Sequence, residues 1–176
     1  MGFGIVNYLE PPGAAPDERT DIAVRTDGRV EATIRIQASG QGNETSFAQV
    51  AAEAPRIPIA NVSIIFNDTD KVVDGLGSHA DWSMQLGGTV LVRASEKMLA
   101  ESREWATELL EAADADIRNA DGRFNVAGTD RSLGLFGIAA PAPLTAAERS
   151  RLGSTRAQIA SPPARSKSTL RRVCSS

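Results

Sequence analysis

The sequence predicts an α/β (α+β) fold in which a mixed and antiparallel sheet packs on one long helix. Residues 21–37 alternate apolar and polar side chains on both sides of a Thr26-Asp27-Gly28 turn, which is the pattern of a β-hairpin. Residues 83–113 instead repeat apolar and small side chains at spacings of three and four, which is the pattern of a helix. Gly87-Gly88 lowers the stability of that helix, and a close backbone approach would explain the pair.

The other expected elements are shorter. A helix over 46–54 and a strand over 61–66 separate the hairpin from the long helix. A polar turn follows at 67–70, where Asp68 and Asp70 cap their own backbone rather than bind a metal. A second hairpin over 117–126 turns at Asp121-Gly122, and a strand-to-helix segment covers 133–140. An apolar strand is also expected near the N-terminus, over residues 5–9.

Charge divides the 176-residue chain into two parts. Residues 1–140 hold 12 of the 19 Lys and Arg and 21 of the 22 Asp and Glu, a net charge of −9, whereas residues 141–176 carry +6. We therefore expect a folded body at 1–140 and a basic tail at 141–176. Because the tail has almost no large apolar residues, it is expected to be disordered. Its composition also resembles an out-of-frame or truncated end.

Composition excludes several classes of function. The net charge of −3 does not indicate nucleic-acid binding, and a basic tail is more often solvated than bound to nucleic acid or membrane. A single cysteine, Cys174, excludes a disulfide or a cysteine metal site within the chain, and a single His79 argues against zinc. No apolar run approaches the ~18 residues of a membrane span. Without a visible signal peptide, a cytoplasmic location is expected.

The turn between the first hairpin and the first helix has the pattern of a binding loop. Gly40 and Gly42 flank Gln41, and glycines there permit positive φ and close approach of a ligand. The N–H groups of a first helical turn suit an anionic group such as a phosphate. Thr45 and Ser83 are the expected N-caps of the two helices. A capped turn without any ligand is the alternative explanation of the same residues.

The order of the motifs resembles a known family. The chain is similar to the second molybdenum-cofactor-binding region of the xanthine dehydrogenase/aldehyde oxidase family, and most similar to aerobic carbon monoxide dehydrogenase large subunits. The resemblance covers residues 2–143. Its motifs are Gly40-Gln41-Gly42-Asn43-Glu44-Thr45, Phe47-Ala48-Gln49, Asp68-Thr69-Asp70, Gly77-Ser78-His79, Ala120-Asp121-Gly122-Arg123-Phe124 and Val126-Ala127-Gly128-Thr129-Asp130.

The resemblance implies a molybdenum-molybdopterin cofactor, in some members its cytosine dinucleotide, and oxidation of a small substrate such as carbon monoxide, an aldehyde or a heterocycle. Electrons would leave through an iron–sulfur small subunit and an FAD medium subunit, with the remaining part of the large subunit as a further partner. Gln41 would bind near the metal, and Gly40 and Gly42 would permit close approach. The other implied cofactor-binding residues are Thr45, Ser78, His79 and Ser83.

The chain also departs from the family pattern. Asn43 stands where members usually have His, and Trp82 stands where they have an Arg that a Trp cannot replace at an anion site. The family's catalytic glutamate lies in a later Gly-x-Gly-Glu motif that these residues do not contain. We therefore expect no catalytic residue and no protein-held metal here, and interpret the chain as a fragment that is inactive alone. The alternative is a catalytically silent remnant or a small binding or structural module without cofactor.

Overall fold

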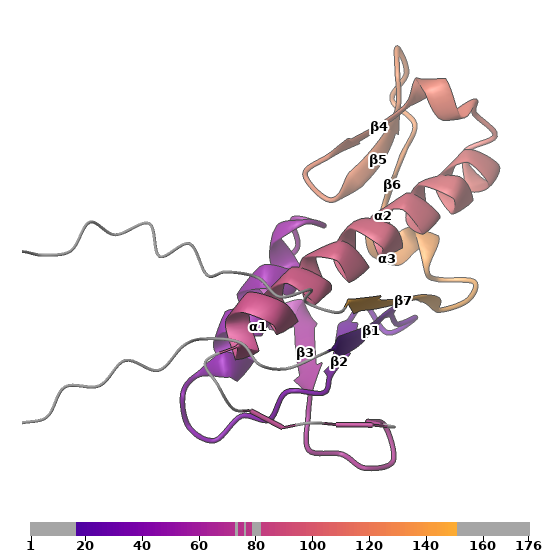
Figure 1. Ribbon diagram of the computed structural model, residues 1–176. Helices are drawn as coiled ribbons and strands as arrows, with labels where there is room; N and C mark the ends of the chain where they lie inside the picture. The colour runs from indigo at the N-terminus through magenta and orange to yellow at the C-terminus, as the bar shows by residue number, and fades with distance from the viewer. Residues whose placement is uncertain (1–16, 73, 76, 79–81, 151–176) are drawn as a thin grey trace, which may run out of the picture.

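The computed structural model describes residues 17–72, 74–75, 77–78 and 82–150 (Figure 1). A four-stranded sheet and a smaller three-stranded sheet are joined by one long helix. The strands are β1 (Glu18–Val24), β2 (Val30–Ile34), β3 (Val62–Ile65), β4 (Ile117–Ala120), β5 (Arg123–Val126), β6 (Ser132–Gly134) and β7 (Leu144–Ser150). The helices are α1 (Asn43–Glu53), α2 (Thr89–Leu109) and α3 (Leu135–Ile138), with a π-helical turn at Ser83–Gly88 and single 3-10 turns at Ile59–Asn61 and Asp114–Asp116.

The main sheet has the strand order β3-β2-β1-β7. β1 pairs antiparallel with both β2 and β7, whereas β2 pairs parallel with β3, so the sheet is mixed. The predicted first hairpin is confirmed: Val24 pairs with Val30, and Gly28 has the positive φ of 85° that the turn requires. The predicted fold class is therefore confirmed.

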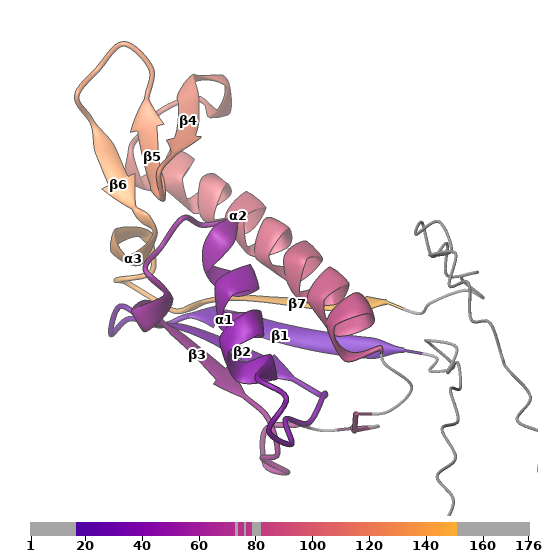
Figure 2. The same ribbon diagram turned by 90° about the vertical axis from the view of Figure 1, so that its left-hand side faces the viewer.

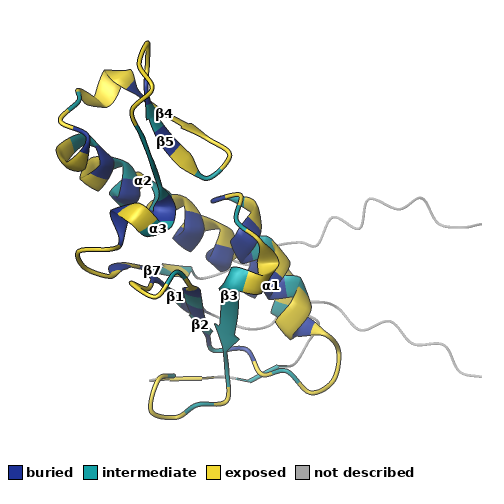
Figure 3. Cartoon of the chain, turned by 180° about the vertical axis from the view of Figure 1, so that it is seen from behind, coloured by how far each residue is buried: buried dark blue, intermediate teal, exposed yellow. Residues whose placement is uncertain are grey.

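The core lies between one face of the main sheet and the two longer helices. Figure 2 shows α2 over β1 and β7, with α1 beside it over β2 and β3. Alternate residues of β1 and β2 point to this face and are buried, as period-two strands require. Figure 3 shows the buried sides of both helices turned toward the sheet. The largest contributors are Ile22, Ile34, Ile36, Phe47, Leu91 and Met98, all at most 1% exposed.

The long helix differs from its prediction at both ends. Its first six residues form a π-helical turn, and α2 proper ends at Leu109 rather than at residue 113. The expected close approach at the glycine pair is confirmed for Gly87, because a Cβ there would overlap Ile36 Cδ1 and lie 3.3 Å from Phe47 Cζ. Met84, at the start of the predicted buried face, is 39% exposed, and the face is then buried from Gly88 to Ser102. Beyond it, Trp105 and Leu109 are 42% and 43% exposed.

The second, smaller sheet has the order β4-β5-β6 and lies at the C-terminal end of α2. Its β4–β5 hairpin turns at Asp121 and Gly122 as predicted, with φ of 51° and 70° at the two positions. Gly122 also packs closely on the end of α1, since a Cβ there would lie 2.7 Å from the Pro55 carbonyl oxygen. The predicted strand-to-helix segment that follows is confirmed as β6 and α3.

The C-terminal boundary predicted at residue 140 is wrong. β7 lies beyond it, at Leu144–Ser150, and pairs with β1 along its whole length. The sequence pattern does not reveal this strand, because β7 buries only Leu144 and Ala146 and has no large β-branched or aromatic residue. Residues 151–176 and the strand expected near residue 5 lie outside the described residues. No helix in the described part of the chain is long and apolar enough to cross a bilayer.

Candidate functional site

The connection from β2 to α1 exposes an open stretch of backbone. Gly40 has a φ of 100° and Gly42 a φ of 80°, values that residues with a side chain rarely adopt. A Cβ built on either glycine would have no atom within 4 Å. Glycine is therefore required by the backbone conformation, and the space above both residues is free. Such a surface beside a helix start permits close approach of an anionic group.

α1 begins at Asn43, with Gly42 as its N-cap. The prediction of Thr45 as N-cap is therefore wrong, and Thr45 is an exposed third residue of the helix. The left-handed Gly42 already turns the chain, and its carbonyl oxygen accepts the first helical hydrogen bond, from the Ser46 N–H at 3.2 Å. The helix start has no side-chain cap, so its first N–H groups lack the protein acceptor that a Ser or Thr cap supplies.

Gln41 is exposed and lies against its own loop. Its Oε1 accepts a hydrogen bond from the Ser39 N–H at 2.6 Å, and its Nε2 donates a longer one to the Gln37 carbonyl oxygen at 3.4 Å. The contacts are local and at the surface, so the amide is able to rotate away from them when another partner is present. Gln41 thus lies in the turn between β2 and α1, with hydrogen bonds, among the described residues, only to residues of that turn.

The Gly-rich loop after β3, of which Asp74, Gly75, Gly77 and Ser78 are described, meets this turn at one carbonyl group. Ser78 Oγ donates a hydrogen bond to the Gln37 carbonyl oxygen, the same atom that accepts from Gln41. Two segments predicted separately as parts of one site are therefore brought together around Gln37. His79, the third residue of that motif, lies outside the described residues.

Ser83 is half-buried at the start of the π-helical turn. The prediction of Ser83 as a helix N-cap is wrong, because Trp82 occupies that position and has helical backbone angles itself. The π-helical turn packs against α1, with Gly87 beside Phe47. The turn that carries Ser83 is therefore next to α1, but no hydrogen bond joins Ser83 to Gln41 or Thr45 in the described residues.

A pocket of about 250 Å³ lies beside the Gln37 carbonyl. It is bounded by the extension of β2, the polar turn after β3 and the Gly-rich loop. Its lining residues are Arg35, Gln37, Asn67, Asp68, Thr69, Val72, Gly75 and Gly77. Asp68 caps its own turn as predicted, since its Oδ1 accepts from the Asp70 N–H at 3.0 Å. No group of three or more His, Cys, Asp or Glu side chains in the described segments is placed to hold a metal ion.

Glu18 is a buried carboxyl group close to this pocket. It begins β1, is 1% exposed, and accepts a hydrogen bond from the Arg35 N–H at 3.1 Å. Burial raises the pKa of Glu18 from 4.5 to about 7, against the lowering effect of the Arg35 N–H and guanidinium. Sequence patterns do not single out this residue, because the position looks like an ordinary solvent-exposed glutamate before the first strand.

Asn43 is the other residue whose importance only the structure reveals. It is the first residue of α1 and is 7% exposed, yet its buried Nδ2 has no hydrogen-bond partner in the described chain. Buried amide donors are almost always paired, so an unpaired one next to an open backbone surface indicates a missing acceptor. In the sequence, the one sign of this position was that Asn43 stands where family members usually have His. That difference alone does not show that the amide is buried or unpaired.

We expect Asn43→Ala to leave the unfolding free energy of the ligand-free chain unchanged or to raise it by up to about 1 kcal/mol, because the substitution removes an unsatisfied buried donor. Asn61→Ala is the matched control, since Asn61 Nδ2 donates to the Gly28 carbonyl oxygen at 2.9 Å. It should lose about 1 kcal/mol. Urea denaturation measures both, and equal losses in the two variants would contradict an unpaired Asn43.

Comparison with known proteins identifies the family to which this chain belongs. Residues 1–166 match the family model described as "Molybdopterin cofactor-binding domain". The chain belongs to this molybdopterin cofactor-binding domain family. The predicted resemblance to the xanthine dehydrogenase/aldehyde oxidase family is thereby confirmed, and the chain is a molybdopterin-binding domain of the molybdenum hydroxylase type.

Individual relatives agree with this assignment. The chain is 34% identical over 140 residues to 6-hydroxypseudooxynicotine dehydrogenase complex subunit gamma of Paenarthrobacter nicotinovorans. That alignment covers 80% of this chain and 18% of the relative. It is 29% identical to the carbon monoxide dehydrogenase large chain of Hydrogenophaga pseudoflava, over 74% of this chain and 18% of the relative. The molybdopterin-binding domain described here therefore spans about a fifth of the length of these relatives.

Solved structures show the same fold. The reconstituted CO dehydrogenase from Oligotropha carboxidovorans superimposes with a TM-score of 0.70 at 25% identity, over 75% of this chain and 18% of that one. Quinoline 2-oxidoreductase from Pseudomonas putida 86 superimposes with a TM-score of 0.67 at 26% identity, over 78% of this chain and 19% of that one.

Proposed function

We propose that this chain holds a molybdenum-molybdopterin cofactor, in its cytosine dinucleotide form, between the first turn of α1 and the Gly-rich loop after β3. In this role it is part of a molybdenum hydroxylase or dehydrogenase that oxidises a small substrate: carbon monoxide, an aldehyde or a heterocycle. The cofactor, when bound, supplies the redox chemistry, and the chain supplies position and hydrogen bonds.

The observation that carries this proposal is the unpaired Asn43 amide beside the open backbone of Gly40 and Gly42. A pterin and its phosphate are rich in hydrogen-bond acceptors, and phosphates bind at helix starts. The residues present therefore fit the group: a buried donor without a partner, an uncapped helix start and no side chain above the glycines. Of these features, the buried unpaired donor is the one that is unfavourable in a turn that binds nothing.

Different residues would hold different parts of the cofactor. Gln41 would exchange its contacts with Ser39 and Gln37 for the metal end of the cofactor, because both contacts are at the surface. The amides of the first turn of α1, with Thr45, would hold the polar pterin or phosphate part. The opposite side would be formed by Ser78, His79 and Ser83. We assign no catalytic residue and no metal ligand within this chain.

The proposal also includes partners. Two of the relatives are named as subunit gamma of a complex and as a large chain, which supports assembly with other chains. We propose the remaining part of the large subunit, an iron–sulfur small subunit and an FAD medium subunit, all in the cytoplasm. The described strands extend to Ser150, and residues 151–176 hold six Lys and Arg and no Asp or Glu.

Two observations favour a second function. Gln41 already has a partner for its amide oxygen at 2.6 Å, as expected of a closed turn. Trp82 stands where the resemblance expects an anion-binding Arg, and it is fully buried in this structure. The alternative is therefore a silent remnant or a small structural module that keeps the fold without the cofactor.

Cofactor analysis separates the two functions. The chain would be expressed in a host that makes molybdopterin, purified without oxygen and assayed for molybdenum and for pterin fluorescence after oxidation. We expect molybdenum and pterin in amounts close to one per chain. A folded chain, with the circular dichroism of a mixed α/β protein but without either component, would establish the structural module instead.

A further inference from the structure

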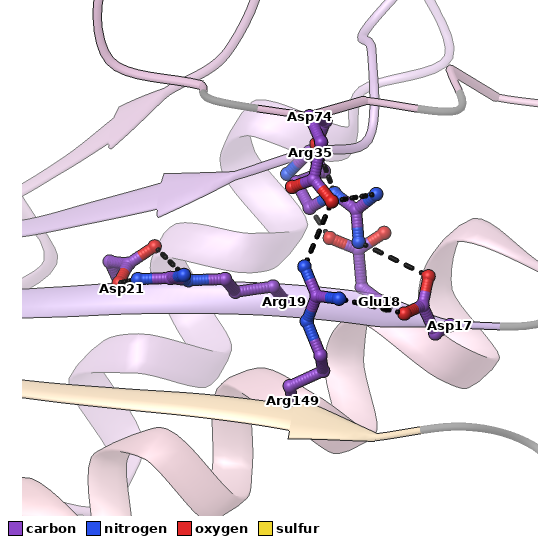
Figure 4. Close-up of polar contacts among 7 residues, drawn as sticks. All are labelled: Asp17, Glu18, Arg19, Asp21, Arg35, Asp74 and Arg149. Atoms are coloured by element: carbon purple, nitrogen blue, oxygen red, sulfur yellow. Dashed lines mark hydrogen bonds and ion pairs between the residues drawn. The ribbon is translucent and has the colours of Figure 1, made fainter.

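Four charged side chains form a closed ring at one end of the main sheet (Figure 4). Arg35, just after β2, and Arg149, in β7, each bridge the same two carboxylates, those of Asp17 and Asp74. The nitrogen–oxygen distances are 3.4 and 3.1 Å from Arg35 to Asp17 and Asp74, and 3.1 and 2.8 Å from Arg149 to the same pair. Charges of opposite sign therefore alternate around the ring, and every neighbouring pair attracts.

Half of this ring is buried. The side chains of Asp17 and Arg35 are 12% and 7% exposed, whereas those of Arg149 and Asp74 are 45% and 48% exposed. Burying a charge without a partner costs free energy, so losing either carboxylate partner of the buried Arg35 guanidinium would destabilise the fold. Asp74 is the ring member that belongs to the Gly-rich loop, and the others lie in or beside strands of the main sheet.

Arg35 holds both the side chain and the backbone of Asp74. In addition to the ion pair, its Nε donates a hydrogen bond to the Asp74 carbonyl oxygen. A guanidinium is suited to such a double contact, because its donors are fixed in one plane. The chain position of Asp74 is therefore fixed relative to β2.

Two successive contacts attach the loop to the extension of β2. Arg35 binds Asp74, and two residues further along the extension the Gln37 carbonyl oxygen accepts from Ser78. The pocket described above lies beside these contacts, with Arg35, Gln37, Gly75 and Gly77 among its lining residues. Releasing Asp74 would leave the Ser78 hydrogen bond as the remaining described hydrogen bond between the loop and this extension.

We propose that the ring of Asp17, Arg35, Asp74 and Arg149 positions the Gly-rich loop, so that Ser78 faces the turn that carries Gln41. The ring members are positioning residues, and Asp74 is the one that connects the sheet to the loop. The consequence for cofactor binding rests on the proposed function, whereas the attachment of the loop does not.

The test is Asp74→Asn in the full chain, because asparagine keeps the size and one acceptor but removes the charge. Asp21→Asn is the matched control: Asp21 pairs with Arg19, outside the ring, and has a similar side-chain exposure of 43%. Amide hydrogen exchange would be followed in peptides that cover residues 68–78, in which the Val72 N–H donates to the Asp68 carbonyl oxygen at 2.7 Å. We expect exchange there to rise about tenfold in Asp74→Asn, as the loss of a charge-assisted contact predicts, and to stay unchanged in Asp21→Asn.

Pterin retained through purification is the second measurement, on the same variants. We expect less pterin in Asp74→Asn than in wild type and Asp21→Asn. Unchanged exchange in Asp74→Asn would overturn the positioning role whatever the pterin content. Faster exchange with full pterin retention would overturn the link between the loop and the site. A wild-type chain without pterin would instead overturn the proposed function, and exchange would still decide whether the ring holds the loop.

Discussion

Gly87→Ala is expected to lower the unfolding free energy of the chain by about 1–3 kcal/mol, the usual cost of overpacking a core. The new methyl group would overlap Ile36 Cδ1 and press on Phe47, 3.3 Å away. Both neighbours are fully buried, so neither side chain has free space into which it can move. Chemical denaturation of the purified chain measures the loss as a lower midpoint with an unchanged slope.

Gly88→Ala is the matched control for this substitution. A Cβ at Gly88 meets only Met84, with Sδ at 2.9 Å, and Met84 is 39% exposed and flexible. The methionine can move, and alanine favours helix by about 1 kcal/mol over glycine, so this variant should be as stable as wild type or more so. Equal losses at the two positions would contradict the close approach of the π-helical turn to α1 and β2.

The second large effect is on the pH dependence of stability, and it depends on Glu18. Its pKa is about 7 in the folded chain, whereas a solvent-exposed glutamate, as in the unfolded chain, has a pKa of 4.5. Between these values the folded chain keeps a proton that the unfolded chain has lost. The contribution to stability is therefore fully present below about pH 4.5 and is lost as pH rises through about 7, a change of about 3 kcal/mol.

Glu18→Gln isolates this contribution. Glutamine keeps an oxygen that accepts from the Arg35 N–H but does not ionise, so the variant should lose much less stability than wild type between pH 5 and pH 8. The charged groups that act on the Glu18 carboxyl are Arg35, which lowers its pKa, and Asp17, which raises it. Unfolding free energies measured at half-unit steps of pH would test the claim, and parallel curves for wild type and variant would show that Glu18 does not titrate in this range.

Local patterns were sufficient to predict most elements of the fold. Strict alternation in residues 21–37 and the Thr26-Asp27-Gly28 turn give β1 and β2, whose pairing needs no distant partner. β7 was not predictable in the same way. It pairs with β1 over more than a hundred residues of intervening chain, and it buries only Leu144 and Ala146 against the core. Its stability depends on its partner strand, so its own sequence has no clear strand pattern.

In the candidate site too, features that depend on local sequence were predicted, and features that depend on distant parts of the chain were not. The Gly40-Gln41-Gly42 turn and the Ser78 loop were predicted from motif order, and the structure places them at one carbonyl group. The unpaired amide of Asn43 depends on burial by surrounding elements, which no motif reveals. The charged ring includes Arg149, which is 132 positions from Asp17 and which the sequence assigned to a disordered tail.

The most direct test of the cofactor site is the pterin and molybdenum content of Gln41→Ala beside that of Gln49→Ala. Both remove one exposed glutamine side chain near α1, but Gln49 lies toward the other end of the helix, beside a separate pocket. We predict that Gln41→Ala loses most of its molybdenum and pterin while remaining folded, and that Gln49→Ala keeps the wild-type content. Equal cofactor content in the two variants would contradict the site described here.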